Sequence, residues 1–220
     1  TLAPEGRINQ ENLRGAQATD IFFLEGIGEE THEPRFTYHG FRYVEVEAPQ
    51  EVQIHEIRAK VLHTDVRRTG FFTSSHEELN QLYNAVIWTE RSNMHSVPTD
   101  CPQRDERMAW LNDMTVRCEA ASIHFDLVHF YRKWMDDLAD EQSSSGYVPD
   151  TAPYIYGGNP AQHISSCMVL VPWLMYLNYG DETTMRKFYG NMRRYLLFLD
   201  SQTAEDGILK DKYYGEWAAP

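Results

Sequence analysis

The hydrophobic pattern of the chain changes its period near Gly70, and this change constrains the fold more than any other feature. From about Asp20 to Thr69 apolar and polar residues alternate, which is typical of strands that bury one face. The alternating segments are 21–24, 41–46, 52–54 and 57–61. Beyond Gly70 the apolar residues recur at helical spacing. We therefore predict a small antiparallel β segment followed by an all-α segment, and hence a mostly α chain.

The second segment contains the start and stop signals of several helices. Ser74 and Glu77 have the spacing of a capping box, and the apolar residues that follow lie on one helical face: Leu79, Leu82, Tyr83 and Val86. Further helices are predicted at about 106–124, 127–142, 164–179 and 181–201. Their aromatic stripes predict core residues at Trp134, Trp173, Phe188, Tyr195 and Phe198. Helices joined by short turns and long aromatic loops favour stacked hairpins, as in a toroid whose loops line a pocket.

The charge of the chain limits its partners. The chain has 33 acidic and 20 basic residues, a formal net charge of −13. Such a field repels phosphate backbones and anionic lipid, so we expect no nucleic acid and no membrane as partners. The 13 tyrosines and five tryptophans supply flat apolar faces with polar edges, which suit a carbohydrate. A neutral sugar is the ligand class that this composition favours.

No metal or other cofactor is expected. The three cysteines, Cys101, Cys118 and Cys167, lack the close pairs of a zinc site or a disulfide framework, and the histidines lack paired metal-ligand spacing. The N-terminus has neither an initiator methionine nor the layout of a signal peptide, and we interpret it as processed or cut. The compartment stays open.

Four carboxylates crowd into fourteen residues, interleaved with arginines and one tryptophan: Asp100, Asp105, Glu106 and Asp113, with Arg104, Arg107 and Trp110. A helix that starts near Asp105 would place Glu106, Trp110 and Asp113 on one face. Crowded carboxylates raise one another's pKa, and a carboxyl kept protonated near neutral pH can act as a general acid. The alternative is structural, because acidic first turns and solvated salt-bridge faces are common on helices.

The run Asp100-Cys-Pro-Gln-Arg-Asp-Glu-Arg, followed by Trp110 and Asp113, resembles the signature of glycoside hydrolase family 78, the bacterial α-L-rhamnosidases. The segment 36–44 looks like the end of the β-domain that precedes the catalytic domain in that family. The segment 213–220 is similar to the family's Tyr-Gly-Asp-Trp-Leu-Ala-Pro element. The resemblance extends over nearly the whole chain.

This resemblance implies a fold, an activity and roles for particular residues. It implies a β-sandwich-type segment at 1–72 and the first part of an (α/α)6 barrel at 73–220, an incomplete toroid of about five helices. It implies hydrolysis of α-L-rhamnosides with inversion, without a cofactor, and with Glu106 as general acid. The implied rhamnose-binding residues are Asp100, Arg104, Trp110, Asp113 and Trp217. The family's general base is a glutamate far downstream of Pro220, so we expect the chain to be a fragment that is inactive by itself.

Two further observations concern the substrate. The long loop that contains Tyr154 is polar, aromatic and rich in proline and glycine, as loops that line ligand pockets are, and Tyr154 is a further candidate for substrate binding. Residues 108–113 lack the glycines that the family often has around Trp110. Two alternatives therefore stay open. One is a glycosidase of the same fold for another deoxy-sugar or a uronic-acid polymer, and the other is a non-catalytic carbohydrate-binding module.

Overall fold

The computed structural model describes residues 1–159 and 166–209, and its contacts divide the chain into two compact units. The first unit contains Thr1–Leu62 together with Cys101–Arg107, and the second contains His63–Asp100 with Met108–Pro220. The signature segment 101–107 thus belongs to the first unit, although the sequence around it belongs to the second.

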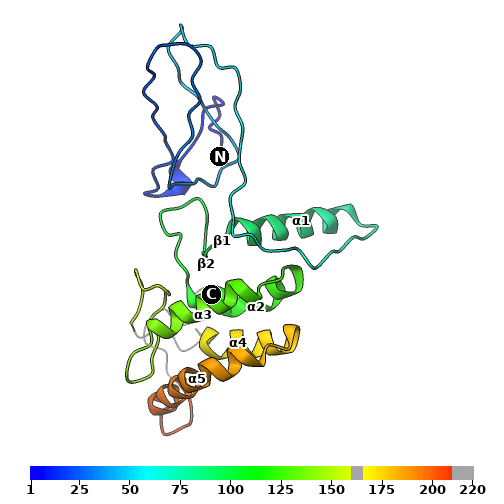
Figure 1. The fold of residues 1–220 in the computed structure, drawn as a ribbon, viewed down its shortest axis with the longest axis vertical. Helices are drawn as coiled ribbons and strands as arrows, with labels where there is room; N and C mark the ends of the chain where they lie inside the picture. The colour runs from blue at the N-terminus through cyan, green and yellow to red at the C-terminus, as the bar shows by residue number, and fades with distance from the viewer. Residues whose placement is uncertain (160–165, 210–220) are drawn as a thin grey trace. The chain divides into compact units, whose positions relative to one another are not determined.

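The second unit is helical (Figure 1). Its helices are α1 (Glu77–Ser92), α2 (Leu111–His124), α3 (Val128–Asp140), α4 (Cys167–Tyr179) and α5 (Glu182–Gln202). Helix α4 packs against α2, α3 and α5, and α3 also packs against α5. The prediction of a mostly α chain that forms part of a helical toroid is confirmed.

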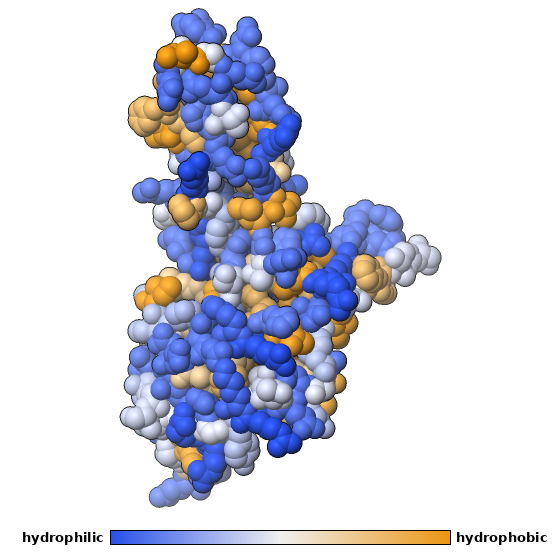
Figure 2. All heavy atoms as spheres, in the orientation of Figure 1, coloured by the Kyte–Doolittle hydropathy of each residue, from blue (hydrophilic) through white to orange (hydrophobic). Residues whose placement is uncertain are grey.

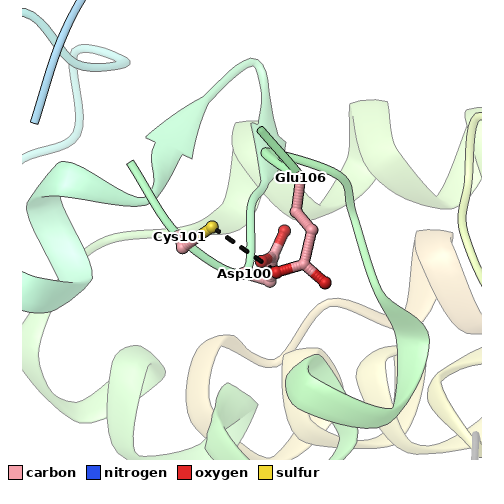
Figure 3. A group of neighbouring side chains, drawn as sticks. All are labelled: Asp100, Cys101 and Glu106. Carbon is pink, nitrogen blue, oxygen red and sulfur yellow. Dashed lines mark hydrogen bonds between the residues drawn. The ribbon is translucent and has the colours of Figure 1, made fainter. Parts of the chain in front are cut away.

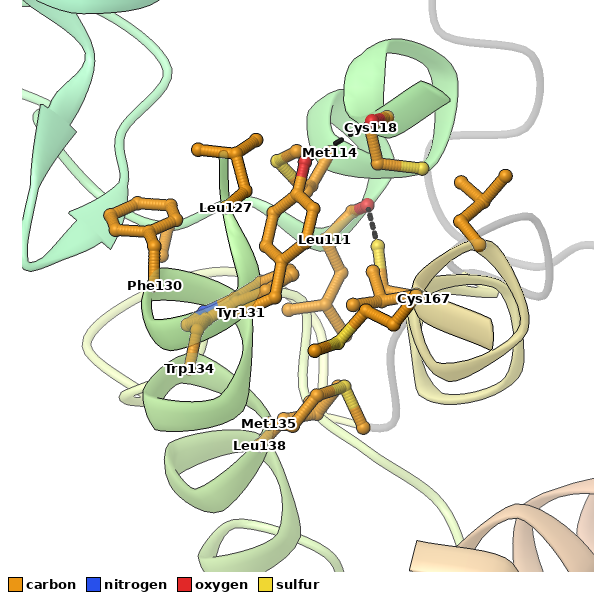
Figure 4. Packing of buried hydrophobic residues seen from close by; sticks show 14 of the residues in the cluster. Leu111, Met114, Cys118, Leu127, Phe130, Tyr131, Trp134, Met135, Leu138 and Cys167 are labelled. Atoms are coloured by element: carbon orange, nitrogen blue, oxygen red, sulfur yellow. Dashed lines mark hydrogen bonds between the residues drawn. The ribbon is translucent and has the colours of Figure 1, made fainter. Parts of the chain in front are cut away.

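The core of this unit lies where α2, α3 and α4 meet (Figure 4). Trp134, Tyr131 and Leu111 are fully buried there. The indole N–H of Trp134 donates to the carbonyl of Ala152 at 2.9 Å, and the hydroxyl of Tyr131 donates to the carbonyl of Cys118 at 3.2 Å. Both aromatic side chains therefore bury large apolar faces without leaving a polar tip unpaired.

Most of the predicted core aromatics are buried. Trp134, Phe188 and Tyr195 are core residues, and Phe198 is half-buried. The prediction for Trp173 is wrong, since its side chain is 44% exposed. Helix α4 is apolar on nearly every side, so its periodicity does not distinguish the buried face from the exposed one.

The first helix begins differently from the predicted capping box. Helix α1 starts after His76, without a side-chain cap. Ser74 accepts a hydrogen bond from the backbone N–H of His76 at 3.0 Å, and Asn80 exchanges two hydrogen bonds with the backbone of Ser74. The amide of Asn80 therefore holds the turn before α1. The apolar stripe of α1 also faces outward, with Leu82 61% exposed.

The predicted strands at 21–61 are not formed. Within residues 1–62, all of which the structure describes, the regular features are a 3-10 turn at Glu11–Leu13 and one isolated bridge between Leu2 and Ile8. Apolar residues remain exposed in this unit, and the side chain of Phe23 is 88% exposed. Orange patches on the molecular surface show such exposed apolar groups (Figure 2). Alternation indicates which face a strand would bury, but a strand also needs a hydrogen-bonded neighbour. The second unit contains a short hairpin, β1 (Met94–His95) with β2 (Val97–Pro98), that the sequence pattern did not indicate.

No described helix combines the length and the apolar character needed to cross a bilayer.

The start of α5 provides a test of stability. Asp181 caps the helix by accepting from the backbone N–H groups of Thr183 and Thr184, and it accepts from Arg132 at 2.9 Å. The hydrogen bond from Arg132, despite opposing burial, lowers the pKa of Asp181 from 3.8 to about 2. We expect Asp181→Ala to lower the free energy of unfolding at pH 7 by about 1 to 2 kcal/mol, because it removes the cap. Urea denaturation followed by circular dichroism measures this difference.

The pH dependence of that difference follows from the sign of the pKa shift. The folded pKa is depressed, so the stabilisation by the Asp181 carboxylate is present above pH 3.8 and is lost as the pH falls towards 2. The difference in the free energy of unfolding between the wild type and Asp181→Ala should become smaller over that range. Asp181→Asn is the matched control, because asparagine caps helices about as well without the charge. A gap that stays constant with pH would contradict the assignment.

Candidate active site

The signature segment is a loop that Asp100 closes. The backbone N–H of Asp100 donates to the carbonyl of Met108 at 3.0 Å, and Oδ1 of Asp100 accepts from the N–H of Met108 at 2.8 Å. Arg107 has a left-handed backbone, with φ 52°. Helix α2 begins only at Leu111. The predicted helix from near Asp105, with Glu106, Trp110 and Asp113 on one face, is therefore wrong, because these hydrogen bonds hold the chain in a non-helical turn.

A buried polar network in the second unit supports the residues just before the loop. Arg117 of α2 donates to the carbonyl of Thr99 at 3.0 Å and lies 3.5 Å from the carboxylate of Glu90 on α1. Thr99 also donates to the side chain of Asn93. Burial raises the pKa of Glu90, and the nearby Arg117 only partly offsets this effect. The network fixes the backbone that leads into Asp100.

Glu106 lies in the first unit, where two guanidiniums and a thiol contact its carboxylate. Figure 3 shows the thiol of Cys101 beside this carboxylate. Its Oε2 lies 2.8 Å from the guanidinium of Arg14 and 2.9 Å from that of Arg104. The thiol of Cys101 donates to the same oxygen at 4.0 Å. The Glu106 side chain is 26% exposed. Within this unit the groups in direct contact with the carboxylate are therefore two guanidiniums and a thiol.

Asp105 anchors the loop beside Glu106. Arg14 donates through Nε to Oδ1 of Asp105 at 3.0 Å, and the backbone N–H of Gly15 donates to Oδ2 at 3.2 Å. Partial desolvation opposes ionisation of Asp105, but hydrogen bonds from the backbone and from Arg14 outweigh it and lower the pKa. A side chain on Gly15 would place its Cβ 2.8 Å from Oδ2 of Asp105, so it would have to displace this carboxylate.

Tyr38 and Gly40 hold other parts of the same loop. Arg107 donates to the carbonyl of Tyr38 at 2.8 Å, and its guanidinium lies 5.1 Å from the centre of the Tyr38 ring. A Cβ on Gly40 would lie 3.0 Å from the side chain of Gln103. The loop is thus held in the first unit by a cation–π contact and close backbone packing, in addition to ion pairs.

Trp110 lies in a second cluster, at the start of α2. Its backbone is extended and forms a bridge with Thr151. Its ring meets that of Tyr156 edge to face, with the centroids 6.2 Å apart. Asp150 is buried, and its carboxylate accepts from the N–H of Gly158 at 2.5 Å. The loop that contains Asp150 and Tyr156 therefore sets the position of the indole.

The other predicted site residues have varied surroundings. Tyr154 is 41% exposed, and its hydroxyl donates to the carbonyl of Gly157 at 3.3 Å, which places it in the same loop as Tyr156. Asp113 lies exposed in the first turn of α2. Trp217 lies outside the described residues. The structure thus brings Arg104 to Glu106, and Tyr154 into the loop that contacts Trp110.

The donor set around Glu106 does not suit a cation. Cys101 and Glu106 could each offer a ligand atom, but two guanidiniums contact the carboxylate oxygen. Their positive charge would repel a metal ion at that oxygen. The three cysteines are free and buried, and burial raises the pKa of Cys118 to about 11. Burial also raises the pKa of Cys167, so the thiols of Cys118 and Cys167 stay protonated at neutral pH.

Sequence reasoning missed Arg14, although it makes the densest set of contacts to the loop. Arg14 and Asp105 are 91 positions apart. Arg14 is in no motif, and neither charge nor periodicity distinguishes it from the other arginines. Only the folded chain reveals its role.

The helical hairpins and the signature loop with its paired carboxylate define a segment of a six-hairpin glycosidase. The model for the bacterial alpha-L-rhamnosidase 6 hairpin glycosidase domain matches residues 67–220, and that for the bacterial alpha-L-rhamnosidase concanavalin-like domain matches residues 1–63. The chain belongs to the bacterial α-L-rhamnosidase family.

Relatives with this name are similar over nearly the whole chain. An alpha-L-rhamnosidase of Streptomyces avermitilis is 39% identical over 98% of the chain and 21% of its own length. One of Formosa agariphila is 32% identical over 100% of the chain and 24% of its own length. The chain thus spans between a fifth and a quarter of the length of these relatives.

Solved structures of α-L-rhamnosidases are also similar to the chain. The Streptomyces avermitilis alpha-L-rhamnosidase complexed with L-rhamnose has a TM-score of 0.90 at 38% identity, covering 99% of this chain and 21% of that one. The native enzyme of Aspergillus terreus has a TM-score of 0.82 at 36% identity, covering 89% of this chain and 23% of that one.

Gly157 allows a test of the Trp110 cluster. Its φ is +105°, and an added Cβ would lie 2.7 Å from the Cβ of Asp150 and 3.0 Å from the indole of Trp110. We expect Gly157→Ala to lower the free energy of unfolding by about 1 to 3 kcal/mol, since the residue would be strained in this region. The displaced indole should also change the tryptophan fluorescence of the folded protein. Chemical denaturation and emission spectra measure the two effects.

Gly190→Ala is the matched control. Gly190 lies within α5, and an added Cβ would meet only the end of the Arg194 side chain, at 3.7 Å. Alanine favours helix over glycine by about 1 kcal/mol, so this change should stabilise the protein. Equal stability of Gly157→Ala and the wild type would refute the crowding argument.

Proposed function

We propose that the protein hydrolyses terminal α-L-rhamnosyl residues of glycosides or polysaccharides with inversion, and that Glu106 is the general acid. The observation that supports this most directly is a partly exposed carboxylate, held by two guanidiniums and a thiol, in the signature loop of a chain that belongs to this family. Binding of L-rhamnose by the Streptomyces avermitilis relative supports the choice of sugar.

In the proposed reaction Glu106 donates one proton to the leaving group. The bond between the anomeric carbon and the glycosidic oxygen breaks, its electron pair goes to that oxygen, and the proton of Glu106 neutralises it. A water molecule adds to the anomeric carbon from the opposite face and gives its proton to a base. In inverting enzymes acid and base are about 6.5 to 9.5 Å apart, so one short loop does not easily supply both. By the resemblance, a glutamate downstream of residue 220 is the base.

The remaining sites are assigned to sugar binding. Arg104 offers a charged donor to the hydroxyls of rhamnose, and it contacts Glu106 at the same time. Trp110 offers an aromatic face for stacking, and Asp100, Asp113, Tyr154 and Trp217 complete the proposed set. Hydroxyls that bind Arg104 would orient the sugar relative to the acid, which favours the reactive geometry.

Replacing the acid should separate catalysis from binding. We expect Glu106→Gln in the full-length protein to reduce hydrolysis of a rhamnosyl disaccharide by about 10²- to 10⁴-fold, the usual contribution of general acid catalysis. Binding of L-rhamnose, measured by calorimetry, should persist because the amide is isosteric. Glu119→Gln, an exposed position on α2, is the matched control and should retain full activity.

A panel of aryl glycosides distinguishes the alternatives. Turnover of another deoxy-sugar or a uronide, with none of the rhamnoside, would overturn the choice of substrate. Sugar binding by a wild-type protein that turns over no glycoside would identify a binding module. Full activity of Glu106→Gln would remove that residue from the mechanism.

The stereochemical course is a separate prediction. Direct displacement by water inverts the anomeric carbon, so an α-L-rhamnoside should first release β-L-rhamnose. Proton NMR during early turnover resolves the two anomers before they equilibrate. Initial release of the α anomer would mean retention and would contradict the proposed mechanism.

A further inference from the structure

Two ion pairs and one long thiol hydrogen bond converge on one oxygen of Glu106. Arg14, Arg104 and Cys101 all contact Oε2, at 2.8, 2.9 and 4.0 Å. Oε1 receives none of these three contacts. The donor set therefore distinguishes the two carboxylate oxygens, which are chemically equivalent in an isolated side chain.

This asymmetry has a consequence for a proton donor. A neutral carboxylic acid has one carbonyl oxygen that accepts hydrogen bonds and one hydroxyl that donates. Guanidinium groups only donate, so the oxygen that they contact takes the role of the carbonyl. The proton then belongs on Oε1. Once it has left, the two positive charges stabilise the carboxylate that remains.

Arg14 is placed for this task before any substrate binds. Its backbone has φ 56° and ψ −117°, a conformation that is rare for a residue other than glycine and costs free energy. The preceding 3-10 turn and the close approach of Gly15 to Asp105 hold it there. One guanidinium thus bridges two adjacent carboxylates, fixing the loop through Asp105 and the side chain of Glu106.

We propose that Arg14 is a positioning residue for the general acid: with Arg104 and Cys101 it holds Oε2 of Glu106 and so makes Oε1 the oxygen that delivers the proton. This inference rests on the proposed function. It assigns a part in the chemistry to the segment matched by the concanavalin-like domain, residues 1–63, which contains Arg14.

The leaving group tests this role. A sugar or alkyl leaving group requires a proton, whereas 2,4-dinitrophenolate departs as a stable anion and gains little from one. In the full-length protein we expect Arg14→Ala to lower kcat for a rhamnosyl disaccharide by about 10²-fold, because the acid is misplaced. The kcat for 2,4-dinitrophenyl α-L-rhamnoside should fall by only about threefold or less, because this leaving group needs little acid catalysis, and KM should change little. Arg14→Lys should recover part of the disaccharide activity, since lysine keeps the positive charge but lacks the planar guanidinium that bridges the two carboxylates.

Arg7→Ala is the matched control. Arg7 also bridges two carboxylates in the first unit, Glu45 and Glu47, both at 2.6 Å, but these lie outside the signature loop. Its loss should affect both substrates equally or not at all. Thermal denaturation of each variant reveals any general loss of folding. An Arg14→Ala variant with equal losses on the two substrates, or with no loss, overturns the inference.

Glu106→Gln on the same two substrates separates this inference from the proposed function. If Glu106→Gln lacks the leaving-group dependence, the acid assignment itself fails. If Glu106→Gln has it and Arg14→Ala does not, only the positioning role fails.

Discussion

The ion pairs that Arg14 makes with Asp105 and Glu106 are the contacts on which the candidate site depends. A short loop that lacks helical hydrogen bonds has little to define its conformation, so its side chains need external partners. Here Asp100 closes the loop through Met108, and Arg14, Tyr38 and Gly15 hold its middle. These contacts hold Glu106, the proposed acid, in a defined turn, as a proton donor requires.

The same contacts reconcile two demands that appear opposed. A general acid has to be neutral when it acts, yet two guanidiniums adjoin Glu106, the proposed acid. In the proposed mechanism both guanidiniums contact Oε2, so they leave Oε1 to carry the proton and then stabilise the carboxylate that proton transfer leaves behind. Crowding by other carboxylates, which the sequence suggested, would hold the proton but would not orient it.

The helical unit has apolar surface that fits its place in a larger family architecture. Leu82 on α1 and Trp173 on α4 are exposed, although apolar stripes on amphipathic helices usually pack against another element. The chain spans about a fifth to a quarter of its relatives' length. In a ring of six hairpins each hairpin packs against the next, so faces of this kind are expected on part of such a ring.

The sequence by itself determined the helices, most of the core and the family. The 3.6-residue period and the Gly180-Asp181 break placed α5 within one residue of its observed ends, because these signals are local. Trp134, Phe188 and Tyr195 were predicted as core for the same reason. Only the tertiary structure decided that α2 begins at Leu111, that Trp173 is exposed, and that Arg14 contacts Glu106. These outcomes depend on partners far away in sequence, up to 91 positions for Arg14 and Asp105, and no local pattern encodes which distant residue a side chain meets.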